Sequence, residues 1–356
     1  MTANSQSFAP VPDAQTASYQ AFIGAFRKLW AGPIYRELRQ QAGALPDQSP
    51  EAYDRYEARL AQLPIHQLFG WLEHNLQLMK YRGAHGVVPM VEGQRQALEQ
   101  ALLQPVPDGM LTLSEDMALP DYYKLTDFHH HPGGLREDPL AGIVYRTSAG
   151  AAGGVVGRAG LHRLFANHVT RDRGFDRVLD IGCGFGRSTL AFAGTGSDTR
   201  AVGIDLSAGC LRLAAHLGAE IAGKDRVRYL QADGASVPQE DAGFDLVTST
   251  MLLHELSADA IRDMTAEAFR LLQPGGEVAH LDFLPPDDNF LRALFLGHSD
   301  RNAEPHMRDL AAIDLPTEFQ KAGFADISIT PFDETGGETG DGWRLPWVVI
   351  RARKPQ

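Results

Sequence analysis

The sequence predicts an α/β fold in which a doubly wound, mostly parallel sheet follows an all-helical N-terminal domain. Three observations support this. Apolar residues recur at helical spacing over residues 17–104, short buried strands alternate with helices from residue 175 onward, and two further strand-like segments close the chain. The length of 356 residues and the 44% hydrophobic content fit two globular domains.

The N-terminal part divides into a tail, a helical domain and a connector. Residues 1–15 are polar and contain Pro10 and Pro12, which predicts a disordered tail. Residues 16–168 are expected to form a helical domain for substrate binding and dimerisation, with a connector of mixed structure from about residue 105. The amount of apolar helical surface leads us to expect a homodimer. The apolar positions that mark the helices include Phe22, Phe26, Leu29, Tyr53, Tyr56, Leu68, Trp71 and Leu72.

The C-terminal part, residues 169–356, is expected to form the second domain. Five short apolar segments predict buried strands, and helices between them indicate parallel pairing. The last two segments, around Ile327 and Val348, could form a terminal antiparallel pair. The five predicted parallel strands are residues 177–181, 201–205, 227–231, 244–248 and 277–283.

Composition excludes several classes of function. The chain has 33 Lys and Arg against 45 Asp and Glu, a formal charge of −12, and its basic residues form no stripe, so we expect no nucleic-acid partner. Two cysteines, Cys183 and Cys210, are too few for a disulfide framework. No secretion signal and no apolar run of 18 residues is present, which predicts a cytoplasmic protein without a membrane partner.

The sharpest motif is a glycine-rich segment, Val178-Leu-Asp-Ile-Gly182-Cys-Gly184-Phe-Gly186-Arg-Ser. Its glycines let the backbone turn tightly after the first strand, at the place where a doubly wound sheet binds ligands. A dinucleotide-binding loop would carry a third glycine at position 187, which is Arg. The glycines alternate instead, and Asp180 precedes them.

This segment resembles motif I of the class I S-adenosylmethionine-dependent methyltransferases. Later positions agree with the family in the same order. Asp205 closes the second strand, Asp233 follows the third, Phe244-Asp-Leu-Val-Thr-Ser-Thr-Met resembles the fourth, and Arg270-Leu-Leu-Gln-Pro-Gly-Gly-Glu resembles the next helix-to-strand turn. Taken singly, each aspartate could be a helix cap or a turn residue. The resemblance covers residues 173–354 and implies a Rossmann-like domain of the small-molecule type, as in ubiquinone and menaquinone biosynthesis.

The resemblance implies S-adenosyl-L-methionine as cofactor and assigns residues to it. Asp180 would help to hold the methionyl moiety, Asp205 would accept both ribose hydroxyls, and Asp233 would lie at the adenine amino group. The full set of expected cofactor-binding residues is Asp180, Gly182, Gly184, Gly186, Asp205, Leu206, Asp233, Gly234 and Thr250.

In related enzymes the loop after the fourth strand faces the methyl group. Here it contains His254 and Glu255, so His254 could act as a general base that Glu255 orients, or it could only cap the next helix. The loop lacks the Asn/Asp-Pro-Pro-Tyr/Phe motif of enzymes that methylate exocyclic amines of nucleic acids. We therefore expect a small-molecule acceptor.

The connector concentrates polar and aromatic residues, with Tyr122, Tyr123, His129 and His131 close to Asp127. We expect it to line the acceptor pocket, with His129 and Tyr122 as candidate catalytic residues and Tyr123 and His131 as substrate-binding residues. No metal is predicted, although His129 and His131 would share one face of an extended strand, and a surface turn is a further alternative. The other expected substrate-binding residues are Tyr145 and Arg146, which could instead form a surface ion pair, and His298 and His306 of an expected lid after the fifth strand.

The predicted reaction is O- or S-methylation by in-line displacement. A phenol-like acceptor would need a base, whereas a small acidic thioether or thiol would need only orientation. Two alternatives come from other classes: hydride transfer with NAD, against which Arg187 argues, and S-adenosylmethionine binding without catalysis.

Overall fold

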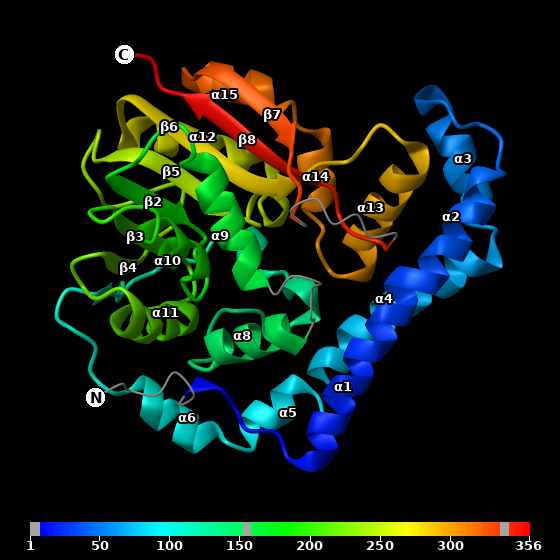
Figure 1. Cartoon of the computed structure of the whole chain (residues 1–356), viewed down its shortest axis with the longest axis horizontal. Coiled ribbons are helices and arrows are strands. Elements are labelled where there is room, and N and C mark those ends of the chain that lie inside the picture. Colours follow the sequence, from blue (N-terminus) through cyan, green and yellow to red (C-terminus); the bar gives the residue numbers. More distant parts are fainter. Residues whose placement is uncertain (1–7, 152–157, 335–341) are drawn as a thin grey trace.

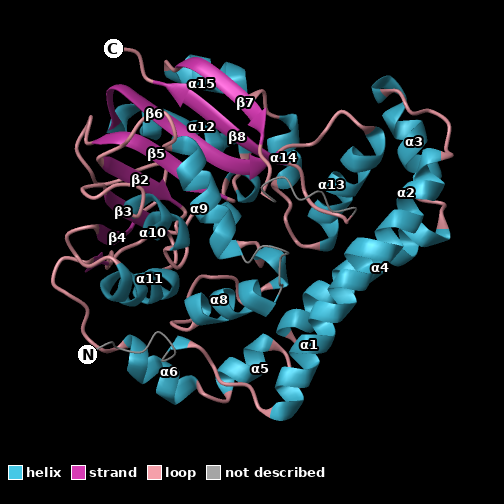
Figure 2. Cartoon of the chain, viewed as in Figure 1, coloured by secondary structure: helices cyan, strands magenta, loops and turns pink. Residues whose placement is uncertain are grey.

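The computed structural model describes residues 8–151, 158–334 and 342–356. Its centre is an eight-stranded sheet in the order β1-β4-β3-β2-β5-β6-β8-β7, flanked by helices (Figures 1 and 2). The strands from β1 to β6 pair in parallel, and β8 pairs antiparallel with both β6 and β7. The strands are β1 Leu111–Thr112, β2 Arg177–Ile181, β3 Arg200–Asp205, β4 Val227–Gln231, β5 Phe244–Thr250, β6 Leu272–Phe283, β7 Ala325–Pro331 and β8 Trp347–Arg353.

The predicted parallel strands and the antiparallel terminal pair are confirmed, and β1 is an addition that the sequence pattern did not indicate. Apolar strand residues face helices on both sides of the sheet, as a doubly wound fold requires. One core joins the sheet to α9, α10 and α11, and the other joins it to α12, α14 and α15. These helices are α9 Arg158–Val169, α10 Arg187–Ala193, α11 Ala208–Ile221, α12 Ala258–Leu271, α14 Met307–Ala312 and α15 Leu315–Ala322.

Helices α1 to α4, within residues 14–81, form an arm that extends away from the sheet (Figure 1). A π-helical turn at Trp30–Ile34 joins α1 to α2, and α4 packs against both. The arm shares an apolar core with α13, so the segment after β6 is built into the body of the molecule. The remaining helices are α1 Ala14–Leu29, α2 Tyr35–Gly43, α3 Tyr53–Leu60, α4 Pro64–Tyr81, α5 Val87–Glu92, α6 Arg95–Leu102, α7 Asp121–Lys124, α8 Ala141–Ala151 and α13 Asn289–Arg301.

The N-terminal predictions differ from the structure in two places. Residues 8–15 were expected to be disordered, but Phe8 is buried against His216 and α1 begins at Ala14. The expected boundary at residue 168 falls inside α9, whose Leu161 and Phe165 belong to the core under the sheet. The connector therefore packs as part of the α/β body, because its apolar side chains cover one face of the sheet.

In the part of the chain that the structure describes, no helix is long and apolar enough to cross a membrane. The parallel strands β2, β3, β4, β5 and β6 end at one edge of the sheet. Their carboxyl ends are where a fold of this kind binds its ligand.

Candidate functional site

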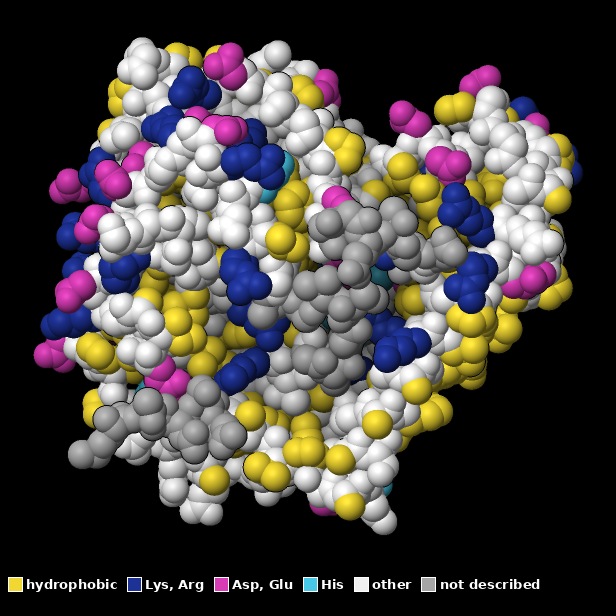
Figure 3. All heavy atoms as spheres, in the orientation of Figure 1, with side chains coloured by type: hydrophobic (Ala, Val, Ile, Leu, Met, Phe, Trp, Pro, Cys, Tyr) yellow, Lys and Arg dark blue, Asp and Glu magenta, His cyan; other side chains and the backbone are white. Residues whose placement is uncertain are grey.

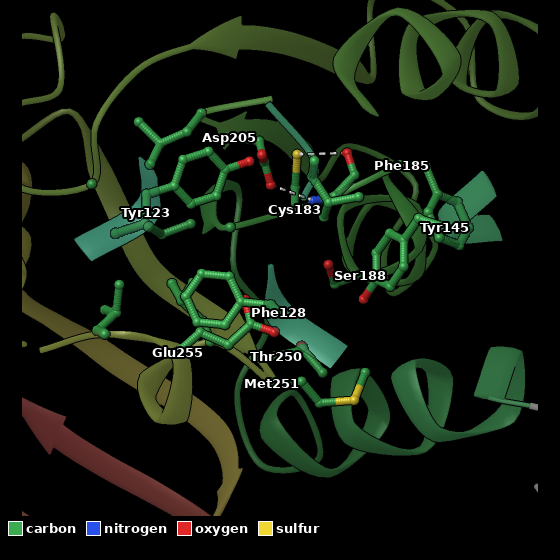
Figure 4. A pocket seen from close by; sticks show the side chains of 18 of the residues that line it. Tyr123, Phe128, Tyr145, Cys183, Phe185, Ser188, Asp205, Thr250, Met251 and Glu255 are labelled. Atoms are coloured by element: carbon green, nitrogen blue, oxygen red, sulfur yellow. Dashed lines mark hydrogen bonds between the residues drawn. The ribbon is translucent and has the colours of Figure 1, made fainter. Parts of the chain in front are cut away.

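A pocket opens at this edge, between the glycine-rich loop and the connector (Figure 4). Asp205 and Tyr123 lie on one side of it, Tyr145 and Ser188 on another, and Glu255 below them. Its wall contains residues from β3, from the loops after β2, β4 and β5, and from the segment 122–145. The fold thus brings the cofactor motif and the connector to one cavity.

Asp205 is fixed by the glycine-rich loop. The backbone N–H of Gly184 donates to Asp205 Oδ2 and that of Ser207 donates to Oδ1, both at 2.8 Å. Each carboxylate oxygen keeps a second lone pair, so the carboxylate can accept one ribose hydroxyl on each oxygen. Burial raises the pKa of Asp205, and the two backbone donors lower it in part, so that the pKa is about 6. At neutral pH this group is therefore an ionised acceptor for a diol.

The turn after β2 depends on glycine. Gly182 has φ +67°, and a Cβ on it would lie 2.7 Å from Leu252 Cδ1. Gly186 has φ +85°, and a Cβ there would lie 2.6 Å from the hydroxyl of buried Tyr229. Both the backbone conformation and the contacts exclude a side chain.

Asp180 lies beneath the loop and not on the pocket wall. It is fully buried, and its Oδ2 accepts hydrogen bonds from the hydroxyls of Ser188 and Thr189, both at 2.6 Å. Burial raises its pKa to about 7. The structure therefore shows Asp180 holding the start of α10 against β2. Its Oδ1 is buried without a hydrogen-bond partner, and the expected contact with the methionyl group stays a prediction.

Among the other expected cofactor residues, Gly186 does not line the pocket but lies behind its wall, next to Tyr229. The rest line the pocket. The Oδ1 of Asp233 accepts from Ala235 N at 2.9 Å, and the Thr250 hydroxyl is buried without a hydrogen-bond partner. A polar atom of that kind inside a cavity points to a ligand. The residues that line the pocket are Gly182, Gly184, Asp205, Leu206, Asp233, Gly234 and Thr250.

The connector supplies the opposite wall, with Tyr122, Tyr123, His129, His131 and Tyr145 all lining the pocket. The Tyr123 hydroxyl and both ring nitrogens of His131 are buried without a hydrogen-bond partner. Burial lowers the pKa of His131 to about 4, so the ring is neutral and can both donate and accept a hydrogen bond. The interpretation as a surface turn is wrong, because this segment faces the cavity.

His129 lines the pocket from a short 3₁₀ turn, Phe128–His130. Its φ is +55°, a conformation that a non-glycine residue adopts only when its surroundings enforce it. The Nε2 of His129 lies 3.0 Å from Glu255 Oε1, and its Nδ1 lies 2.7 Å from Glu304 Oε1. Burial opposes the charged form, but Glu304 and Glu255 together raise the pKa of His129 to about 9.

His254 is only 2% exposed and does not line the pocket itself. Its Nδ1 lies 2.8 Å from Asp282 Oδ1, whereas its Nε2 lies 3.8 Å from Glu255 Oε1. Asp282, and not Glu255 as expected, therefore orients this ring. The other oxygen of Asp282 accepts from the backbone N–H groups of Leu252 and Leu253, at 3.0 and 2.7 Å.

Three expected substrate-binding residues lie outside the pocket lining. Arg146 is half-buried, and burial lowers its pKa. His306 pairs with Asp309 at 2.7 Å. His298, on α13, lies 2.5 Å from Glu73 Oε1 on α4. His298 therefore binds the arm, whereas His306 contacts the pocket residues Tyr122 and Phe128 without lining the pocket itself.

Sequence reasoning missed several residues at the site. Asp282 carried a usable signal, because it stands near the carboxyl end of the fifth parallel strand in His280-Leu-Asp-Phe. Glu73 and Glu304 carried none, since only the packing of α4 and α13 brings them to the histidines. Tyr81 and His162 of the pocket wall likewise come from helices whose pattern gave no indication of a ligand.

Comparison with known proteins agrees with this geometry. A family model for a methyltransferase domain matches residues 178–276, from β2 into β6. A demethylmenaquinone methyltransferase of Clavibacter sepedonicus is 31% identical over 131 residues, which cover 37% of this chain and 51% of that protein. A ubiquinone/menaquinone biosynthesis C-methyltransferase of Pseudomonas savastanoi is 31% identical over 146 residues, covering 39% and 56%. The chain thus spans about half the length of these curated relatives.

Among solved structures, the YcgJ protein of Bacillus subtilis is 22% identical with a TM-score of 0.43, and the match covers 55% of this chain and 99% of that one. The family match spans the glycine-rich loop, Asp205 and Asp233, which the pocket brings together. Residues 178–276 therefore belong to a class I S-adenosylmethionine-dependent methyltransferase domain, which is distantly related to the ubiquinone and menaquinone enzymes.

Proposed function

We propose that this protein transfers the methyl group of S-adenosylmethionine to an oxygen of a small-molecule acceptor. The observation that carries the proposal is that one cavity is lined by Asp205, from the cofactor motif, and also by His129 and Glu255. A donor and an acceptor bound there would lie in one enclosed space. In-line displacement requires little more than such alignment and the exclusion of water.

The part of the cavity beside His129 and Glu255 suits an acceptor that must lose a proton. His129 and His254 flank Glu255, and each ring is held by a second carboxylate. The Glu255 carboxylate can accept the proton of a hydroxyl as the methyl group arrives, and the charged ring of His129, whose pKa is about 9, orients that carboxylate. The unpartnered atoms of Tyr123 and His131 would provide hydrogen bonds that orient the acceptor.

The cofactor end is tested by thermal unfolding with S-adenosylhomocysteine, with NAD or with neither ligand. S-adenosylhomocysteine at about 100 times its Kd should stabilise the wild type by about 2.7 kcal/mol. Asp205→Ala should lose this stabilisation, because the paired acceptors for the ribose disappear. Asp198→Ala, which removes an exposed carboxylate, is the matched control and should keep it. Stabilisation by NAD alone would overturn the assignment.

A second candidate is S-methylation of a thioether or thiol, which needs no base, and the curated relatives named as C-methyltransferases add carbon as a third acceptor atom. Replacing His129 by Gln separates the first two. With a hydroxyl acceptor, we expect kcat to fall about 100-fold or more. With a thioether acceptor, most of kcat should remain, and His168→Asn, which changes a residue outside the pocket lining, should be neutral with both. Equal loss for both acceptors would contradict a role for His129 in proton removal.

We also propose that the helical arm forms a homodimer. Four large apolar side chains are 44–62% exposed on the packed helices α1 and α4: Phe22, Leu29, Leu68 and Trp71. Figure 3 shows hydrophobic side chains gathered along this edge of the molecule, at the lower right. An exposed apolar strip on two packed helices is typical of a surface that another chain covers.

A further inference from the structure

His129 and His254 are held in the same way. The Nδ1 of His129 lies 2.7 Å from Glu304 Oε1, and the Nδ1 of His254 lies 2.8 Å from Asp282 Oδ1. Glu304 and Asp282 are 1% and 0% exposed, so each is a fixed acceptor for the Nδ1 proton. With that proton in place, the Nε2 of a neutral ring carries a lone pair. Metal-binding histidines are oriented by such carboxylates.

Both Nε2 atoms lie near one oxygen of Glu255. Glu255 Oε1 is 3.0 Å from His129 Nε2 and 3.8 Å from His254 Nε2. One ligand atom from each of the three residues lies within 4.8 Å of the other two. Bonds of 2.0–2.1 Å in tetrahedral geometry place ligand atoms about 3.3 Å apart. The observed spacing is thus that of ligands around one ion, reached by small side-chain movements.

A separate observation points to the same place. Glu304 Oε2 is buried and has no hydrogen-bond partner, and it lies 3.8 Å from His254 Nε2. A buried carboxylate oxygen without a donor is costly unless a ligand or a water completes it. This atom could contact a cation directly or through a bound water.

A divalent cation would also balance the charge of the cluster. With both ligand rings neutral, as metal binding requires, the cluster holds four carboxylates and one guanidinium, that of Arg301 beside Glu73, which leaves a charge of −3. His298 lies between Glu73 and Glu304, which raise its pKa to about 9, and its protonation reduces the excess to −2. One divalent ion would balance the remainder. The carboxylates are those of Glu73, Glu255, Asp282 and Glu304.

We propose that His129, His254 and Glu255 bind one divalent transition-metal ion at the acceptor end of the pocket. Two imidazoles and one carboxylate select ions such as Zn²⁺ and Fe²⁺ over Mg²⁺ or Ca²⁺. Binding displaces the ring proton of His129 into solvent. His129 and Glu255 line the cavity, so an open position of the ion would face the acceptor. That last role rests on the proposed function, whereas metal binding itself does not.

The test is a titration of the full-length, chelator-treated protein with Co²⁺, followed by visible absorption and calorimetry. We expect one bound ion per chain, displaced by one equivalent of Zn²⁺. Glu255→Gln and His129→Gln should each weaken binding at least tenfold. Both side chains are partly exposed, at 22% and 29%, which favours folding of the variants. His168→Asn, at the end of α9, is the control and should bind as the wild type does.

Stabilisation by S-adenosylhomocysteine is measured on the same samples, so a failure of metal binding is distinguished from a failure of the cofactor site. Both variants should retain this stabilisation, which shows that they are folded. Absence of saturable Co²⁺ binding to the wild type would overturn the proposal. So would binding that Glu255→Gln and His129→Gln leave unchanged, because the ion would then lie elsewhere.

Discussion

At the scale of single residues, the turn after β2 is the most sensitive place in the cofactor site. Gly182→Ala would place a Cβ 2.7 Å from Leu252 Cδ1 on a backbone with φ +67°. We expect the free energy of unfolding to fall by about 2 kcal/mol and S-adenosylhomocysteine binding to weaken. Gly24→Ala in α1 is the matched control. Its Cβ would meet nothing within 4 Å, so the unfolding free energy should rise slightly.

Urea unfolding of both variants measures these changes. If Gly182→Ala were as stable as the wild type and bound the ligand equally well, the loop would have room that the structure does not show. The sequence predicted the tight turn at this residue correctly, because a positive φ and a close approach leave a direct mark, a glycine. Glu304 leaves no such mark, because a buried glutamate and a surface glutamate look the same in a single sequence.

At the scale of elements, the periodicity of apolar residues predicted the helices and strands that depend on a local pattern. The strands that end at Ile181 and Asp205 alternate with helices, so their parallel pairing and the position of the pocket followed. The segment after β6 was expected to be a polar lid. Instead it contains α13, which buries Phe290, Leu294 and Phe295. Its partners on α4 are more than 200 positions earlier in the chain, beyond the reach of any local pattern.

The junction of α4 and α13 should make stability depend on pH. Glu73 on α4 is 4% exposed and holds His298 on α13, whose folded pKa is raised to about 9 against an unfolded value of about 6.5. A raised pKa contributes stability that is fully present below the unfolded pKa and is lost as the pH rises through the folded one. The free energy of unfolding should therefore fall between pH 6.5 and 9.

His298→Gln isolates this contribution. The variant should be less stable at pH 6.5, and its free energy of unfolding should fall less steeply up to pH 9. His168→Asn, whose ring lies at the end of α9, should keep the slope of the wild type. Chemical denaturation at four pH values in this range provides the comparison. An unchanged slope in His298→Gln would show that the pH dependence arises from another group.

At the scale of the whole molecule, one side of the arm packs against the α/β body. Its inner side packs on α13 and on Trp343, so the arm and the α/β body share a core, although the sequence suggested separate domains. Its outer side exposes Phe22, Leu29, Leu68 and Trp71. The sequence could indicate that these residues are apolar, but only the packing of α1 on α4 shows which of them the chain leaves uncovered.

We expect this outer side to join two copies of the chain. Sedimentation at micromolar concentration should give the mass of a dimer. Trp71→Glu should shift the protein to a monomer, because Trp71, at 62% exposure, would then bring a charge into an apolar contact. Leu125→Glu, which changes a side chain 84% exposed on the connector, is the matched control and should remain dimeric. A wild type that sediments as a monomer at every concentration would contradict the assignment, as would a Trp71→Glu variant that remains a dimer.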